Sequence, residues 1–571
     1  MVCSDVFANA LGSSGTLTTH RFAREILLVE KPQLAEKYLQ SLALTAKINE
    51  AVVGDLQKWL TEEIKMSSKK IGMESNENMP EDEAEEDNDR KVKHGDELKM
   101  HIAFALANLL RRHCESSTTR LHACNEGKDK DVDGFFTSIT TCSDTDCHRN
   151  ALEILTNLPI AGVVPYASQF LCSQDNASYT LQKSALRLLS HVDQKFIDKP
   201  IITRLLRIFQ DACPLPQSTT DQTLATDVLM NAIPEHATVG TFLLRSESLQ
   251  PDNHEKWAYF YDSVAQRRLT IEKVDDYWAR MRRFRVFRPN YLHRSLNALS
   301  NVFGIKIAEK GNYCVQSLTK TEFNGGFFKR SDFLLSVVQS NKRHFPLLGI
   351  TTDTAGLAEY IAESDSYDER SAAFETPKAT VQLNFFNARL PPITVFEGYT
   401  GLLSAIWNAD GSMTEAHDTN IIWRQFINVI PLLSGITLTS DIIGSASFRL
   451  SGSSQISLWN RASSSSFVTN VSASLDSVLT LWTPTGVIGE MAPRLSASGS
   501  VVLHLDVDFY SEPYLFCTVV SQGPLRLRQS TSYVTGSGTR RGLSSIITSP
   551  GRSFALNERT TRMCNKMLQH V

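Results

Sequence analysis

The sequence predicts an α+β chain whose first half is an α-helical solenoid and whose second half consists of antiparallel β-sheets. Downstream of residue 97, helical segments recur about every 20 residues, and prolines separate them. From about Asn301 onward, apolar and polar residues alternate, which is typical of strands with one buried face. We expect three regions: a disordered N-terminus at 1–20, a helical solenoid domain at 21–300 and a sheet domain at 301–571.

The composition is that of an ordinary globular protein. The chain has 571 residues, too many for one hydrophobic core, and 42% of them are apolar and 21% charged. Its formal net charge of −4 gives no bias toward nucleic acid. The most apolar window, 426–438, contains a proline and a glycine and is far shorter than the roughly 18 residues that a membrane-spanning helix needs. We therefore expect several domains, no transmembrane helix and no nucleic-acid partner.

The helical half begins with two amphipathic segments within 21–66. The next stretch, 74–89, is almost purely acidic and polar and cannot bury a core, so we expect a disordered loop there. Four further segments then form pairs at about 40 residues per pair, which indicates an α-solenoid. They read RNALEILTNL, YTLQKSALRLLSHV, IITRLLRIFQDAC and TDQTLATDVLMNAI.

The sheet half carries the strongest pattern. Between Ile427 and Gly489 only four residues are charged, and Ser, Thr and Gly alternate with apolar residues. A second alternating run extends from Val501 to Phe509. Both runs predict strands with one apolar face. One helix is expected to interrupt the strands at 398–408, and its apolar side either packs in a core or lines an apolar cavity.

Cysteines and glycosylation motifs favour an oxidising compartment. There are ten cysteines, and Asn176 and Asn470 begin sequons. Cys142 and Cys147 are spaced for a small loop disulfide, and Cys517 and Cys564 are candidates for a second pair. The N-terminus lacks the basic segment of a signal peptide. Features of an oxidising compartment without a signal peptide suggest a chain that lacks the N-terminal part of a longer protein.

Two local motifs have a functional and a structural interpretation. Asp129, Asp131, Asp133 and Gly134 match the first half of a calcium-binding EF-hand loop, but the twelfth position is Thr140 instead of glutamate. A solvated loop between helices is therefore the better interpretation. An arginine run with interleaved aromatic residues could bind nucleic acid, but the acidic net charge favours an inter-helix salt-bridge seam or a partner-docking surface. Its residues are Arg280, Arg282, Arg283 and Arg285.

No catalytic motif is present in the sequence. It contains no GxSxG, CxxC, HExxH or GxxxxGK[ST]. We therefore expect no enzymatic activity, no cofactor and no metal.

The sheet half resembles the microsomal triglyceride transfer branch of the large lipid transfer family, to which vitellogenins and apolipoprotein B also belong. The resemblance rests on SFRLSGSSQISLWNR, on NVIPLLSGITLTSDIIGSA before it, and on SEPYLFC with a later Met-Cys. It is specific from about Asn290 to Asn565. It is weaker across the helical half, where CSDTDC matches the spacing of the family's short disulfide. The signal peptide and N-terminal β-barrel of the family have no counterpart in this sequence, so the apolipoprotein docking assigned to the barrel is not carried over.

The resemblance implies antiparallel sheets that enclose a lipid cavity and a function in lipid transfer. The cargo would be triglyceride, cholesteryl ester and phospholipid, moved between membranes and to nascent apolipoprotein B-containing lipoproteins. Protein disulfide isomerase would be the partner subunit, membrane contact would be transient, and the location would be the lumen of the endoplasmic reticulum. The residues expected to line the cavity are Phe396, Leu402, Leu403, Ile406, Trp407, Ile442, Phe448, Leu450, Leu458, Leu503 and Leu505.

The sequence is also compatible with two other functions. Within the same fold, a vitellogenin-like storage protein is possible, although the chain has no polyserine tract. From a different class, a solenoid scaffold could bind proteins without any lipid.

Overall fold

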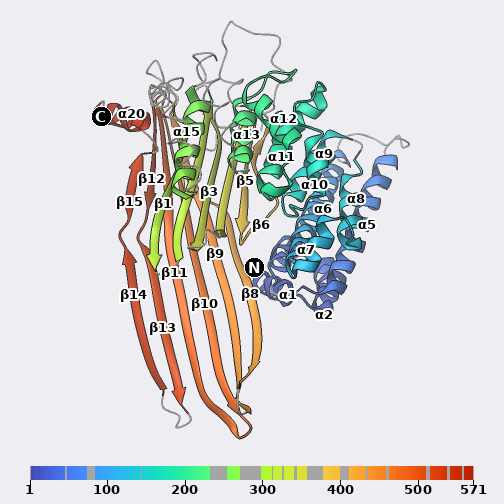
Figure 1. Cartoon of the computed structure of the whole chain (residues 1–571), viewed down its shortest axis with the longest axis vertical. Helices are drawn as coiled ribbons and strands as arrows, with labels where there is room; N and C mark the ends of the chain where they lie inside the picture. The colour runs from blue at the N-terminus through green and yellow to red at the C-terminus, as the bar shows by residue number, and fades with distance from the viewer. Residues whose placement is uncertain are drawn as a thin grey trace. The chain divides into compact units, whose positions relative to one another are not determined.

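A computed structural model confirms the predicted fold class, with helices in the N-terminal part followed by two antiparallel sheets (Figure 1). The residues that it describes are 2–45, 48–73, 84–142, 144–231, 254–270, 298–310, 313–324, 327–339, 344–356, 377–398, 411–432, 435–457, 462–508, 515–535, 540–555 and 558–569.

The chain divides into two compact units, each with helices and one sheet. The first contains 1–109, 407–556 and 560–571, and the second contains 110–406 and 557–559. The change from helix to strand falls near residue 300, as expected. The N-terminal helices, however, form a unit with the second sheet rather than with the other helices.

The prediction of a disordered N-terminus is wrong, because helices α1 (Val2–Ser14) and α2 (Leu17–Phe22) occupy it. Helix α1 packs against α4 (Ala35–Ala43) and against the first long strand of the second sheet. The approach is close: a side chain at Gly12 would overlap the backbone oxygen of Tyr38. Ser41 Oγ also donates a hydrogen bond to Asn9 Oδ1 at 3.0 Å. The residues through which this segment packs are thus small or polar. Because they add little to a hydrophobic periodicity, the sequence pattern does not predict the helix.

The acidic stretch is also more ordered than predicted. Helix α5 spans Glu50–Met73 and helix α6 spans Ala84–Glu115. Residues 84–89, expected in a disordered loop, therefore begin a helix, in keeping with the high helix propensity of Ala and Glu. Residues 74–83 lie outside the described part of the chain.

The following helices stack as a solenoid. Helix α9 packs against α11, α11 against α13, and α13 against α15, while α8, α10 and α12 flank this row. Several of these helices begin at an aspartate whose carboxylate accepts backbone N–H groups. The bounds are α7 Thr118–Asn125, α8 Lys130–Thr140, α9 Thr145–Leu155, α10 Val163–Ser168, α11 Asn176–His191, α12 Lys199–Phe209, α13 Thr219–Asn231 and α15 His254–Thr270.

The second unit also contains sheet A, in which each strand pairs antiparallel with its neighbour in the order β1-β2-β3-β4-β5-β6, and β7 pairs with β5. The strands are β1 Asn301–Lys310, β2 Tyr313–Asn324, β3 Phe327–Gln339, β4 His344–Ala355, β5 Lys378–Phe385, β6 Ala388–Arg389 and β7 Ile393–Glu397.

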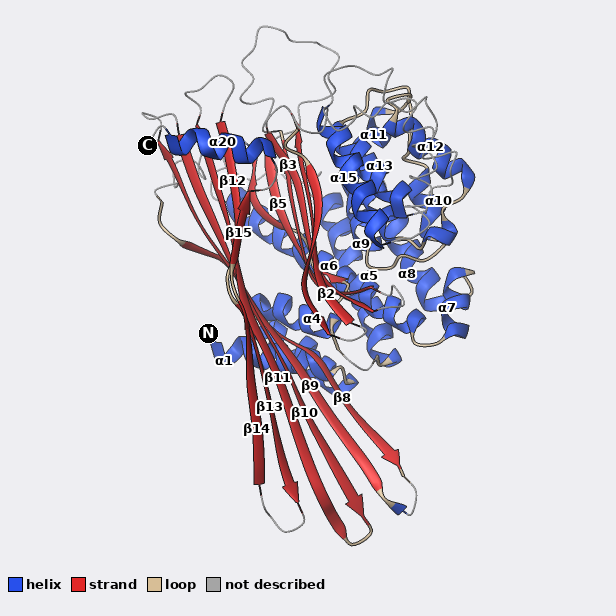
Figure 2. Ribbon diagram, turned by 60° about the vertical axis from the view of Figure 1, so that its left-hand side comes forward, coloured by secondary structure: helices blue, strands red, loops and turns tan. Residues whose placement is uncertain are grey.

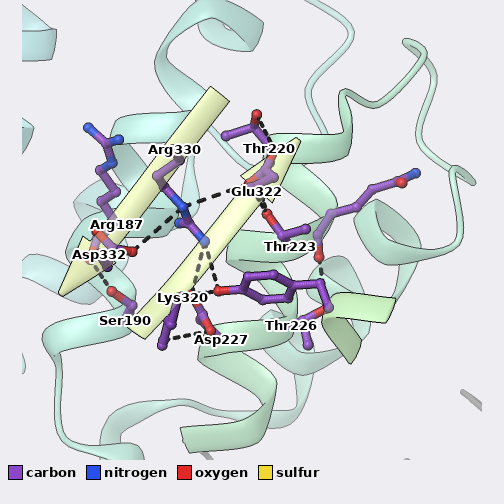
Figure 3. Close-up of polar contacts among 12 residues, drawn as sticks. Arg187, Ser190, Thr220, Thr223, Thr226, Asp227, Lys320, Glu322, Arg330 and Asp332 are labelled. Atoms are coloured by element: carbon purple, nitrogen blue, oxygen red, sulfur yellow. Dashed lines mark hydrogen bonds and ion pairs between the residues drawn. The ribbon is translucent and has the colours of Figure 1, made fainter. Parts of the chain in front are cut away.

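A buried ion network holds sheet A against the solenoid (Figure 3). Arg330 of β3, whose side chain is 2% exposed, lies 3.3 Å from Asp227 Oδ2 of α13 and donates to Tyr259 Oη of α15 at 2.9 Å. Lys320 Nζ lies 2.7 Å from the other oxygen of Asp227. Glu322, which is fully buried, lies 3.7 Å from Arg330 Nε.

Within the network, opposite charges and hydrogen bonds offset the cost of burying each charged side chain. Burial by itself raises the pKa of Asp227, but Lys320 and Arg330 outweigh this effect, so the pKa of Asp227 lies below its ordinary value. Glu322 also accepts hydrogen bonds from Thr220 and Thr223, both at 2.6 Å. Each charge therefore depends on its partners to remain tolerable away from water.

The first unit contains sheet B, in which four strands of 18 to 23 residues are longer than any strand of sheet A. Its order is β14-β13-β11-β10-β9-β8, and β12 pairs with β11 and β15. Figure 2 shows that the hairpins β8–β9, β10–β11 and β13–β14 all lie at one end of the sheet. The elements are β8 Thr414–Pro431, β9 Thr437–Ser457, β10 Ala462–Thr483, β11 Gly486–Asp508, β12 Leu515–Gln522, β13 Leu525–Thr535, β14 Arg540–Ser549, β15 Arg552–Ala555 and helix α20 Glu558–Gln569.

The structure contains both disulfides expected from the sequence, Cys142–Cys147 and Cys517–Cys564. The second one ties α20 to β12. Two further disulfides, Cys114–Cys124 and Cys172–Cys213, were not foreseen. They join cysteines that no motif marks as partners.

Replacing Arg330 with alanine should destabilise the second unit strongly. The change leaves Asp227 and Glu322 buried with less compensating charge, a loss that typically costs about 3–5 kcal/mol. Denaturant-induced unfolding measures it. The control is Arg494→Ala, which removes an exposed pair with Asp476 and should cost about 1 kcal/mol or less. Equal shifts for the two variants would contradict a structural role for the network.

Candidate functional site

The main candidate site is one face of sheet B. Residues directly opposite each other in antiparallel strands share a face, so the register assigns each side chain to a face. Phe448 lies opposite Val471, and Val471 lies opposite Gly499. One row further, Leu450 lies opposite Thr469, which lies opposite Val501. The alternation seen in the sequence thus continues across the three central strands.

We call this the apolar face of sheet B. Its apolar residues in the three central strands are Leu438, Ile442, Ala446, Phe448 and Leu450 of β9; Phe467, Val471, Ala473, Leu475, Leu479 and Leu481 of β10; and Met491, Leu495, Ala497, Val501, Leu503, Leu505 and Val507 of β11.

The opposite face, the polar face of sheet B, carries every charged residue of these three strands. Arg494 Nε and Asp476 Oδ1 form an ion pair there at 2.7 Å, and Asp506 accepts a hydrogen bond from Ser464 at 2.6 Å. Charge is thus excluded from one face along the whole length of these strands. The charged and titratable residues on the polar face are Asp441, Arg449, Asp476, Glu490, Arg494, His504, Asp506 and Asp508.

The register brings together five of the predicted lipid-lining residues: Ile442, Phe448, Leu450, Leu503 and Leu505. Phe396 instead lies on β7, in sheet A. Leu402, Leu403, Ile406, Trp407 and Leu458 lie outside the described residues, as does nearly all of the helix expected at 398–408. The arginine run Arg280, Arg282, Arg283 and Arg285 lies outside them as well.

The apolar face is only partly covered. Phe448 is 1% exposed, but Phe467 is 43% and Leu495 is 40% exposed. Large apolar side chains this exposed on a continuous apolar surface are typical of a binding surface. Because the face offers no charged side chain in β9, β10 or β11, the ligand that fits it is apolar.

A cavity of about 430 Å³ lies on the other side of the sheet, between α1 and the polar face. Serines of β9, β10 and β11 line it together with Arg526 and Arg528 of β13. The serines place this cavity on the polar side of sheet B.

The calcium motif has a structural role. Asp129 is the N-cap of α8, and its Oδ1 accepts the backbone N–H groups of Asp131 and Val132, both at 3.2 Å. Among the described residues, no group of three or more His, Cys, Asp or Glu side chains is arranged to hold a metal ion. In the same part of the chain, no helix is both long and apolar enough to cross a membrane.

A helical stack followed by such sheets defines a lipovitellin-like fold. The structure is similar to a solved structure of lipovitellin, determined for its lipid–protein interactions, with a TM-score of 0.55 over 95% of this chain and 55% of that chain. Sequence identity is 12%, so this likeness concerns the fold alone.

Sequence comparison finds similarity to a particular family. Residues 303–571 match the model of the lipid-binding domain of the MTP large subunit. The chain is 31% identical to a microsomal triglyceride transfer protein homolog of Caenorhabditis elegans over 99% of its own length and 59% of the relative's. It is 23% identical to the microsomal triglyceride transfer protein large subunit of Danio rerio over 83% of this chain and 52% of that protein. The resemblance noted in the sequence is thus confirmed, and the chain spans about half the length of these curated relatives.

Introducing a charge should distinguish the two faces of sheet B. Leu505→Asp places a carboxylate on the apolar face, where it is unpaired, and should abolish lipid retention or folding. His504→Asp makes the same kind of change one residue earlier, at an exposed position on the polar face, and should have little effect. Lipid extracted per mole of protein and the thermal midpoint measure both. Equal effects of the two changes would show that the face assignment is wrong.

Proposed function

We propose that this chain is a lipid transfer protein that binds neutral lipid and phospholipid on the apolar face of sheet B and carries them between membranes. The observation that carries the proposal is the one-sided placement of charge in β9, β10 and β11. Binding is reversible and involves no covalent step, in keeping with the absence of catalytic motifs from the sequence.

The energetics require an occupant for such a face. Apolar surface in contact with water costs roughly 25 cal/mol per Å², so about 1000 Å² would cost on the order of 25 kcal/mol. That exceeds the 5–15 kcal/mol net stability of a typical protein. Bound lipid lowers this cost, and the loose fit of mobile acyl chains permits exchange.

The cargo and its destination are inferred from the relatives. Their names describe triglyceride or triacylglycerol transfer. For this chain we propose triglyceride, cholesteryl ester and phospholipid as cargo and nascent apolipoprotein B-like lipoproteins as acceptors. Protein disulfide isomerase would be the partner subunit in the endoplasmic reticulum lumen. The four disulfides fit an oxidising compartment.

The alternative function is vitellogenin-like lipid storage, since vitellogenins belong to the family that the sequence resembles. Storage and transfer differ in exchange rate rather than in binding. A scaffold function would not need a face that is free of charge.

Extraction of the purified protein with organic solvent, followed by thin-layer chromatography, should yield triglyceride and phospholipid. The protein should also move labelled triglyceride from donor to acceptor vesicles. Phe467→Ser should slow this transfer, because Phe467 lies on the apolar face and is exposed enough to contact a ligand. Its thermal midpoint should change little for the same reason.

The matched control is Val468→Ser, one residue along β10 on the polar face, which should transfer at the rate of the unmodified protein. Bound lipid without transfer would favour storage. A chain without lipid or transfer would contradict the proposal.

A further inference from the structure

The hairpin end of sheet B has an unusual composition. We call residues 428–432, 435–440 and 477–489, at the ends of the hairpins β8–β9 and β10–β11, the hairpin rim. None of these residues is charged. Trp482 lies opposite Thr437, so the two hairpins are neighbours in the sheet. Figures 1 and 2 both show them at the same end.

Large apolar side chains are exposed on both faces of the hairpin rim. Ile430 and Leu481 belong to the apolar face of the sheet, whereas Val429, Trp482 and Val487 belong to the opposite face. These five side chains are between 36% and 63% exposed. A protein docked on one face would leave the other face in water. A lipid surface that the rim enters end-on covers both faces at once.

The distance from the turns to the first charges fits shallow insertion. Asp441 lies four residues beyond Thr437, and Glu490 lies four residues beyond Gly486. At roughly 3.3 Å per residue, the charge-free depth is about 13 Å. Elements that lie in a membrane interface typically reach about 5–10 Å into it. The hairpin rim can therefore enter the interface without burying a charge.

Several polar groups of the hairpin rim have internal partners, which favours insertion into lipid. The strand backbones pair in the ladders of sheet B. In the first turn, the Leu432 N–H donates to the carbonyl of Ile436 at 2.7 Å. The indole of Trp482 donates to Thr439 Oγ1 at 2.9 Å. Tryptophan is also enriched where proteins meet the interface of a bilayer.

We propose that the hairpin rim inserts into the surface of a phospholipid membrane and is the contact through which lipid reaches sheet B. The claim that lipid reaches sheet B through this contact rests on the proposed function. It is supported by the position of the rim on the apolar face of the sheet. Leu438 and Leu481 of the rim lie opposite each other, and the same face continues through Leu479 and Ile442 toward Phe448. A lipid that leaves the membrane at the rim thus meets apolar side chains of β9 and β10 that belong to the apolar face of sheet B.

The test uses the full chain and phosphatidylcholine vesicles in a flotation assay. A double variant, Leu432→Asp with Val487→Asp, puts two charges into the rim and should reduce the floated fraction, with an affinity loss on the order of tenfold or more. The control, Ile546→Asp, makes the same kind of change at an exposed residue of β14 away from the rim and should float like the unmodified chain.

A fluorescent probe tests the site of contact. Thr485→Cys, with Cys3 and Cys314 replaced by serine, carries an environment-sensitive dye in the second turn. Its emission should shift to shorter wavelength when vesicles are added, and that of the same dye at Ser544→Cys should not. Unchanged flotation of the double variant, or no shift at position 485, would overturn the proposal. If the double variant lost binding to a protein partner but still bound vesicles, the rim would be a protein-docking surface. That result would also overturn the proposal.

Lipid extraction from the same preparations separates this proposal from the proposed function. A chain that floats through the rim but carries no lipid would contradict lipid transfer and leave the membrane contact standing. A chain that carries lipid but does not float would contradict the membrane contact alone.

Discussion

The constraint on which the structure depends is that charged side chains must not lie on an apolar surface without water or a partner. Sheet B satisfies it by keeping every charge of its three central strands on one face. In sheet A, Lys320, Glu322, Arg330, Asp332 and Asp353 share one face, and most of them pair with residues of the helices. Each unit thus places the charges of its sheet where hydrogen bonds or solvent can compensate them, because a buried unpaired charge is very costly.

The functional consequence of this arrangement differs between sheet A and sheet B. In sheet A the face that carries these charges packs on the helices, and ion pairs with α11 and α13 and a hydrogen bond with α15 hold it in place. In sheet B part of the apolar face remains uncovered, as the exposure of Phe467 and Leu495 shows. Hydrophobic contact is non-directional, so such a face can bind molecules of varied shape and release them. A polar attachment on one sheet and an apolar, partly exposed surface on the other are both compatible with the proposed lipid binding.

Much of this organisation could be predicted from the sequence, because side chains alternate along a strand with a period of two. The placement of Phe448, Leu450, Leu503 and Leu505 on one face follows from that period once the strands are paired. The Arg330 network could not be predicted, because Arg330 and Asp227 are 103 residues apart and only the fold brings them together. The order at the N-terminus was missed for a different reason: α1 packs through Gly12, Asn9 and other small residues that carry little apolar signal.

The central claim is that lipid contacts the apolar face of sheet B, and photo-crosslinking tests it most directly. The protein would be loaded with a triglyceride that carries a diazirine in an acyl chain, irradiated, digested and sequenced by mass spectrometry. The account predicts adducts at alternate residues of β10 and β11, including Phe467, Leu495 and Leu503, with their neighbours Val468 and His504 unmodified. Adducts on the polar face, or only in the serine-lined cavity beneath α1, would contradict it.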